Sequence, residues 1–138
     1  MPFITQEMVD AAKAEVSNAY NADIIQALGG LGGCRTMEEA PPEVAKWFNR
    51  DVSVAEIMFT TMDALCKESY GSEPSPDMID AGNELLSLLL NVAMAEPILK
   101  AGDDPGFEIP DAWKPYLFSD ETPSAHVYRK MRAVAAGF

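Results

Sequence analysis

Residues 75–95 read SPDMIDAGNELLSLLLNVAMA and carry the strongest structural signal in the chain. Ser75 followed by Pro76 is typical of a helix start, because serine caps free backbone N–H groups and proline fits the first helical position. The apolar residues that follow leave little polar surface, so the sequence predicts a central helix over 76–95. These apolar residues are Met78, Ile79, Ala81, Leu85, Leu86, Leu88, Leu89, Val92 and Met94. Pro97 predicts a kink or an end, because its ring clashes with the carbonyl four residues earlier.

Helical signals also precede this stretch. Thr5 is a good cap for a helix over 5–28, along which one apolar stripe recurs at steps of three and four. The stripe consists of Met8, Ala12, Val16, Ala19, Tyr20, Ile24 and Leu28. Ser53 and Glu56 have the spacing of a capping box and predict a helix over 53–70. Its expected inward residues are Ile57, Met58, Thr61, Leu65 and Cys66.

The last main helix is predicted over 123–136, opened by Thr122 and Pro123. Two short helices are expected over 42–49 and 111–118. No segment alternates between apolar and polar residues, so no significant sheet is expected. The sequence therefore predicts a single all-α domain over 1–138, a compact bundle of four main helices plus two short ones. Leu85, Leu88 and Leu89 are expected near the centre of its core.

The chain of 138 residues carries 22 acidic and 10 basic side chains, for a net charge of -12. An acidic surface repels nucleic acid and anionic membranes and attracts basic partners. The charge is unevenly distributed, because the tail after residue 121 contains three bases and no acid. These bases, Arg129, Lys130 and Arg132, can stabilise the helix end or dock on the acidic body. Cys34 and Cys66 form no disulfide framework, and no signal peptide or spanning segment is recognised, so a cytoplasmic location is expected.

Catalytic and metal-binding patterns are weak. The glycine-rich segment 29–33 follows a helix and lacks the lysine of a phosphate-binding loop, so it is interpreted as a helix terminator. Cys34 and His126 are the available thiol and imidazole, yet their spacing gives no support for a pair. The acids at 103–111 lack the calcium-loop spacing. The sequence therefore predicts no catalytic residue, no metal and no cofactor, and an enzyme is the less favoured class.

The favoured function is protein binding by a small acidic inhibitor that docks on a basic surface of a partner. Phage anti-defence proteins and immunity proteins that inhibit nucleic-acid-handling proteins are functional analogies. Aromatic anchors beside acids suit such an interface. The candidate partner-binding residues are Asp103, Asp104, Glu108, Asp111, Trp113 and Tyr116.

Two alternatives stay open. A helical small-ligand-binding domain or enzyme would hold an apolar pocket between the bundle and the aromatic segments. A deep apolar cavity with convergent polar groups would favour this class, and a contiguous acidic patch would favour protein binding. Self-assembly into a homo-oligomer is the other possibility.

Overall fold

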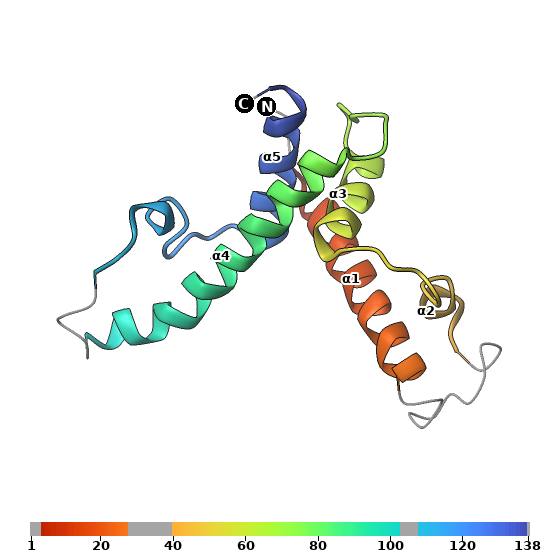
Figure 1. Ribbon diagram of the computed structural model, residues 1–138, viewed down its shortest axis with the longest axis horizontal. Helices are drawn as coiled ribbons and strands as arrows, with labels where there is room; N and C mark the ends of the chain where they lie inside the picture. Colours follow the sequence, from red (N-terminus) through yellow and green to blue (C-terminus); the bar gives the residue numbers. More distant parts are fainter. Residues whose placement is uncertain (1–3, 28–39, 103–107, 138) are drawn as a thin grey trace.

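The computed structural model describes residues 4–27, 40–102 and 108–137 (Figure 1). It contains five α-helices and one short 3-10 helix, and no strand occurs in the described ranges, which confirms the all-α prediction. The elements are α1 (Gln6–Ala27), α2 (Pro42–Ala45), α3 (Val54–Leu65), α4 (Pro76–Ala101), η2 (Asp111–Trp113) and α5 (Pro123–Ala135).

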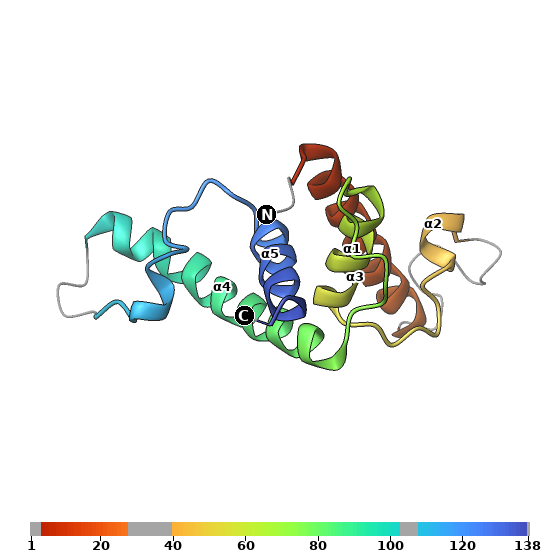
Figure 2. The ribbon, with the colours of Figure 1, turned by 90° about the horizontal axis from the view of Figure 1, so that it is seen from above.

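The core lies where α1, α3, α5 and the first half of α4 meet. In Figures 1 and 2, α1 and α3 lie side by side, and α5 packs on α3 and on the first half of α4. The largest fully buried side chains come from all four helices. They are Met8, Phe59, Met62, Met78, Val127, Tyr128 and Met131. The second half of α4 and the far end of α1 project away from this core as two arms (Figure 1).

Gly82 allows the helices to approach closely within this core. A Cβ atom at Gly82 would lie 2.8 Å from the Met131 sulfur on α5 and 2.9 Å from the Ala55 Cβ on α3. Both distances are shorter than ordinary van der Waals contact. The absence of a side chain therefore sets how tightly α4 packs against α3 and α5.

Buried methionines help to cap two helices. The hydroxyls of Thr5 and Ser75 accept hydrogen bonds from the backbone N–H groups of Met8 and Met78, each at 3.2 Å. In return, the sulfurs of Met8 and Met78 accept from the N–H groups of Thr5 and Ser75, each at 3.4 Å. This is the reciprocal arrangement of a capping box, with sulfur replacing the usual carboxylate. Both predicted starts are confirmed, and each methionine also fills the core.

The predicted helix over 53–70 is too long, because α3 ends at Leu65. Cys66 has extended backbone angles and is buried, whereas Leu65 is 44% exposed rather than inward-facing. The inward residues of α3 that the prediction missed are Ala55, Phe59, Met62 and Asp63. The Asp63 carboxylate binds the N–H groups of Tyr70 and Gly71, which stabilises a loop where the helix was expected to continue.

The predicted end of the central helix at 95 is also wrong. The helix α4 continues through Pro97 to Ala101 and ends at Gly102, which has a left-handed backbone. Pro97 and Ala93 are both exposed, so the carbonyl that loses its helical partner is near solvent and can bond to water. Leu85 and Leu89 are buried as predicted, but Leu88 is only half-buried.

The prediction of one apolar stripe along α1 is only partly correct. Met8, Val9 and Ala12 are buried near the start of α1, but Tyr20 is 66% exposed and Ile24 is 38% exposed, because that end of the helix extends beyond the core. The two short helices are shorter than predicted. Helix α2 ends at Ala45 and turns follow to Asn49, while η2 ends at Trp113 and turns follow to Phe118.

Candidate functional site

Asp63 is the most connected polar side chain of the core. Its carboxylate accepts hydrogen bonds from the Tyr128 hydroxyl at 2.7 Å, the Ser69 hydroxyl at 2.9 Å and the Tyr70 N–H at 2.8 Å. Arg132 completes the group with an ion pair at 3.3 Å. Asp63 thereby ties α3 to α5 and to the loop before α4, although only 6% of its surface is exposed.

The protonation of this cluster follows from its contacts. Burial alone would raise the pKa of the Asp63 carboxyl, but the hydrogen bonds from Tyr70, Tyr128, Ser69 and Gly71 outweigh burial and hold the pKa below its usual value. The pKa of Tyr128 is raised, first by burial and then by hydrogen bonding with Cys66 and Asp63. Asp63 is thus charged and Tyr128 neutral near pH 7. The polar groups around Asp63 already bind its carboxylate, so the arrangement is that of a structural cluster.

The basic tail docks partly on the acidic body. Arg132 pairs with Asp63, and Arg129 pairs with Glu121. These contacts favour the docking interpretation of the tail within one chain. They also neutralise two of the few cations near the core and leave most acids of the surface uncompensated.

His126 has a serine neighbour that the sequence did not predict. Its Nε2 lies 3.1 Å from the Ser119 hydroxyl, and Tyr116 packs edge-on against the imidazole with 5.0 Å between ring centroids. Burial, followed by the field of Arg129, lowers the pKa of His126 against the opposing effect of Glu121. Ser119 also accepts the N–H of Glu121 at 3.2 Å. Among the described residues, no carboxylate hydrogen-bonds the imidazole to orient it as a catalytic base.

The predicted partner-binding residues are only partly brought together. Asp103 and Asp104 lie outside the described residues, as does Cys34. Glu108 and Asp111 are exposed, but Asp111 forms an ion pair with Lys114 at 2.7 Å. Trp113 and Tyr116 are half-buried, and Tyr116 packs on the core. The role of this segment in binding stays a prediction.

The exposed side of α4 has a more distinct character. We call it the α4 outer face, and its exposed members recur at alternating steps of three and four residues: Asp77, Asp80, Glu84, Ser87, Asn91, Met94 and Ile98, with Leu90 beside them. This spacing keeps them on one side of the helix, away from the buried Met78, Leu85 and Leu89.

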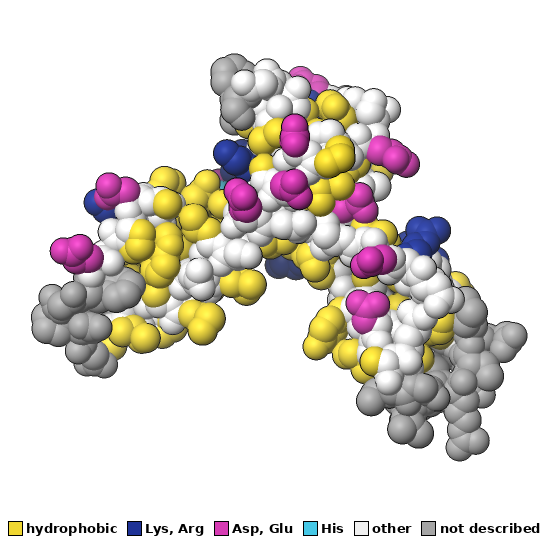
Figure 3. Space-filling model, in the orientation of Figure 1, with side chains coloured by type: hydrophobic (Ala, Val, Ile, Leu, Met, Phe, Trp, Pro, Cys, Tyr) yellow, Lys and Arg dark blue, Asp and Glu magenta, His cyan; other side chains and the backbone are white. Residues whose placement is uncertain are grey.

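The α4 outer face changes character along its length. Its first half carries Asp77, Asp80 and Glu84, whereas its second half exposes 64% of Leu90, 74% of Met94 and 53% of Ile98. In Figure 3, acidic side chains gather over the central lobe where α4 begins, and hydrophobic side chains follow the lower edge of its arm. The surface is thus acidic at one end and apolar at the other. The sequence prediction missed this surface because it counted Met94 among the apolar residues of a central helix and ended that helix at 95.

The η2 segment does not cover this apolar half. The Phe118 N–H donates to Glu96 at 2.8 Å, which fixes the segment on the Glu96 side of α4. Met94 precedes Glu96 by two residues, or about 200° around a helix, and therefore lies on the opposite side. Within the described part of the chain, Leu90, Met94 and Ile98 remain open to solvent.

Other kinds of site find no support in the described ranges. They contain no group of His, Cys, Asp and Glu side chains suited to hold a metal ion. None of the described helices is long and apolar enough to span a bilayer. No protein-family model matches the chain, and neither a curated protein nor a solved structure matches it significantly.

Proposed function

We propose that this protein is a small acidic binding protein that docks through the α4 outer face on a partner whose basic surface adjoins an apolar groove. The observation that supports the proposal is the exposure of Leu90, Met94 and Ile98 on the helix whose other end exposes Asp77, Asp80 and Glu84. An exposed apolar patch next to charged residues is characteristic of a protein interface.

The two halves would contribute differently to binding. The acids would attract a basic partner and accelerate encounter, since exposed charges act mainly on the association rate. The apolar side chains would be buried in the complex, which slows dissociation. An inhibitor of a nucleic-acid-handling protein fits this chemistry, because an acidic face competes for cations that otherwise bind phosphates.

A comparison of three baits tests the proposal. The wild type, Asp80→Lys/Glu84→Lys and Met94→Ser/Ile98→Ser would each be used to capture proteins from a lysate of the source organism, at low and at high salt. A genuine partner is expected to bind the wild type, to be lost with either double variant, and to be weakened by salt because exposed charges are screened. Circular dichroism would confirm that each bait is folded.

The purified partner would then be studied by surface plasmon resonance. The acid reversals should mainly lower the association rate, and the Met94/Ile98 variant should mainly raise the dissociation rate. A partner that is insensitive to both double variants and to salt would contradict the proposal and direct attention to the η2 segment.

A further inference from the structure

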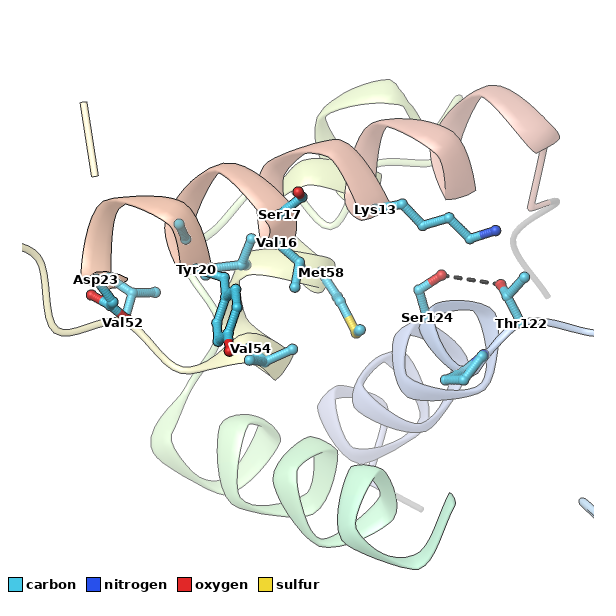
Figure 4. Close-up of a pocket in the computed structure, with 13 residues that line it drawn as sticks. Lys13, Val16, Ser17, Tyr20, Asp23, Val52, Val54, Met58, Thr122 and Ser124 are labelled. Atoms are coloured by element: carbon cyan, nitrogen blue, oxygen red, sulfur yellow. Dashed lines mark hydrogen bonds between the residues drawn. The ribbon is translucent and has the colours of Figure 1, made fainter. Parts of the chain in front are cut away.

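A separate groove lies between α1, the start of α3 and the start of α5 (Figure 4). Its volume is about 450 Å³, within the range of small-molecule sites. Its walls are mainly apolar, with Val16, Val54, Ile57, Met58 and Pro123 along its length. None of its lining residues belongs to α4.

One end of the groove offers a cation and hydroxyl groups. In Figure 4 the Lys13 side chain extends toward Thr122 and Ser124, whose hydroxyl oxygens lie 3.1 Å apart. That hydrogen bond uses only one of the two hydroxyl protons, so the other hydroxyl can donate to a ligand. Ser124 is only 3% exposed. This end therefore combines a positive charge with a sheltered donor.

Lys13 is available for a ligand. Lys46 and Lys114 pair with Glu15 and Asp111, but Lys13 forms no ion pair with any described residue. Arg50, Lys67, Lys100 and Lys130 also form no ion pair with a described residue, but Lys13 alone among the described cations lines this groove. Its position at the end of an apolar groove makes it complementary to a single negative charge attached to an apolar body.

The opposite end of the groove determines the orientation of such a ligand. Asp23 and Tyr20 line that end, and Asp23 is ten residues from Lys13, a span of about 15 Å along a helix. The Asp23 carboxylate repels an anionic head group and therefore does not compete with Lys13 for it. An anionic group is thus favoured at Lys13, while an apolar chain can extend past Met58 and Val54 toward the Tyr20 ring.

We infer that this groove binds an amphiphile with a carboxylate head and an unbranched apolar chain no longer than about 15 Å. One lysine with neighbouring hydroxyls suits one negative charge better than the two of a phosphate monoester, especially in an acidic protein. A cationic amphiphile would meet repulsion at Lys13, and with its direction reversed toward Asp23 it would lose the Thr122 and Ser124 hydroxyls that assist a head group at the Lys13 end. The inference is independent of the α4 outer face.

Binding of octanoate and octylamine, measured by isothermal titration calorimetry below micelle-forming concentrations, tests this inference. The two probes share a chain and differ in the sign of the head charge. Octanoate is expected to bind in a saturable way and at least about tenfold more tightly than octylamine, as one charge-assisted hydrogen bond would give. Lys13→Ala should weaken octanoate binding by about the same factor.

Lys130→Ala is the matched control, because it changes the net charge equally at an exposed position outside the groove. It should leave octanoate binding within about twofold of the wild type, as expected for a distant site. Ala19→Trp would fill the groove and should abolish binding of both probes, with thermal unfolding used to confirm that the variant folds. Absence of octanoate binding, equal affinity for octylamine, or full affinity in Lys13→Ala would overturn the inference.

Discussion

In the first half of α4, Met78, Leu85 and Leu89 lie in the core, whereas in the second half Leu90, Met94 and Ile98 face solvent. Both halves are apolar and helical, so residue type does not distinguish them. The difference comes from the side of the helix on which they lie, since Met78, Leu85 and Leu89 face the other helices, as Val92 still does in the second half, whereas the outer side is uncovered. The core half contributes stability, and the exposed half provides a surface that a partner can bury.

The largest expected effect comes from removing the buried carboxylate of Asp63, which links α3 to α5 and to the loop before α4. Asp63→Ala should lower the free energy of unfolding by about 3–5 kcal/mol, because it leaves Arg132 without its buried partner and Tyr128 without its acceptor. Asp80→Ala, at an exposed position of the same domain, should change it by less than about 0.5 kcal/mol. Urea denaturation would measure both, and similar losses would contradict the distinction between the two regions.

The adjacent residues Leu89 and Leu90 compare the two environments directly. Leu89→Ala should cost about 2–5 kcal/mol, because Leu89 is only 7% exposed and its truncation leaves a cavity. Leu90→Ala should cost less than about 0.5 kcal/mol, because 64% of Leu90 is already in solvent. Equal costs in thermal unfolding would show that the second half of α4 is covered in solution.

Gly82 tests how closely the core half is packed. Gly82→Ala should destabilise the protein by about 1–3 kcal/mol, because the new Cβ would meet Met131 and Ala55 and force them apart. Ser87→Ala lies on the exposed side of the same helix and serves as the control. If Gly82→Ala stabilised the protein, as expected from helix propensity alone, the close approach of α4 to α3 and α5 would be disproved.

The smallest effect concerns pH. The pKa of Asp63 is lowered by folding, so its contribution to stability is present above the unfolded pKa of about 3.9 and is lost as the pH falls through the folded value. The stability advantage of the wild type over Asp63→Asn should thus be constant at neutral pH and shrink in acid. Denaturation curves between pH 7 and about pH 3 would follow it. An advantage that grew in acid would mean that the pKa is raised.

The sequence predicted most of the helices because their starts have local causes. Thr5, Ser53 and Ser75 each accept a backbone hydrogen bond within one turn, and such contacts follow from spacing alone. The ends of helices were less predictable. The end of α3 depends on the Asp63 contacts with residues six to eight positions later, and α4 continues through Pro97 at a place where Ala93 and Pro97 are both exposed.

The functional surfaces were harder to predict because burial is decided by tertiary neighbours. Met94 and Leu89 give the same apolar signal, yet only Leu89 finds partners within the described chain. Two signals were nonetheless present. The regular spacing from Asp77 to Ile98 marks one side of α4, and Asp63 falls four residues after Phe59 and three before Cys66, on the apolar side of α3. The groove at Lys13 depends on three separated segments, and no local pattern reveals it.

The placement of the methionine sulfurs has a consequence for oxidation chemistry. Met8, Met62, Met78 and Met131 are inaccessible to solvent, whereas 74% of Met94 is exposed. Mild peroxide should therefore convert Met94 to its sulfoxide well before those four. The added polarity would fall in the apolar half of the α4 outer face, so oxidative stress would weaken docking there while the capping sulfurs and the fold stay intact. Reduction by a methionine sulfoxide reductase would restore the surface.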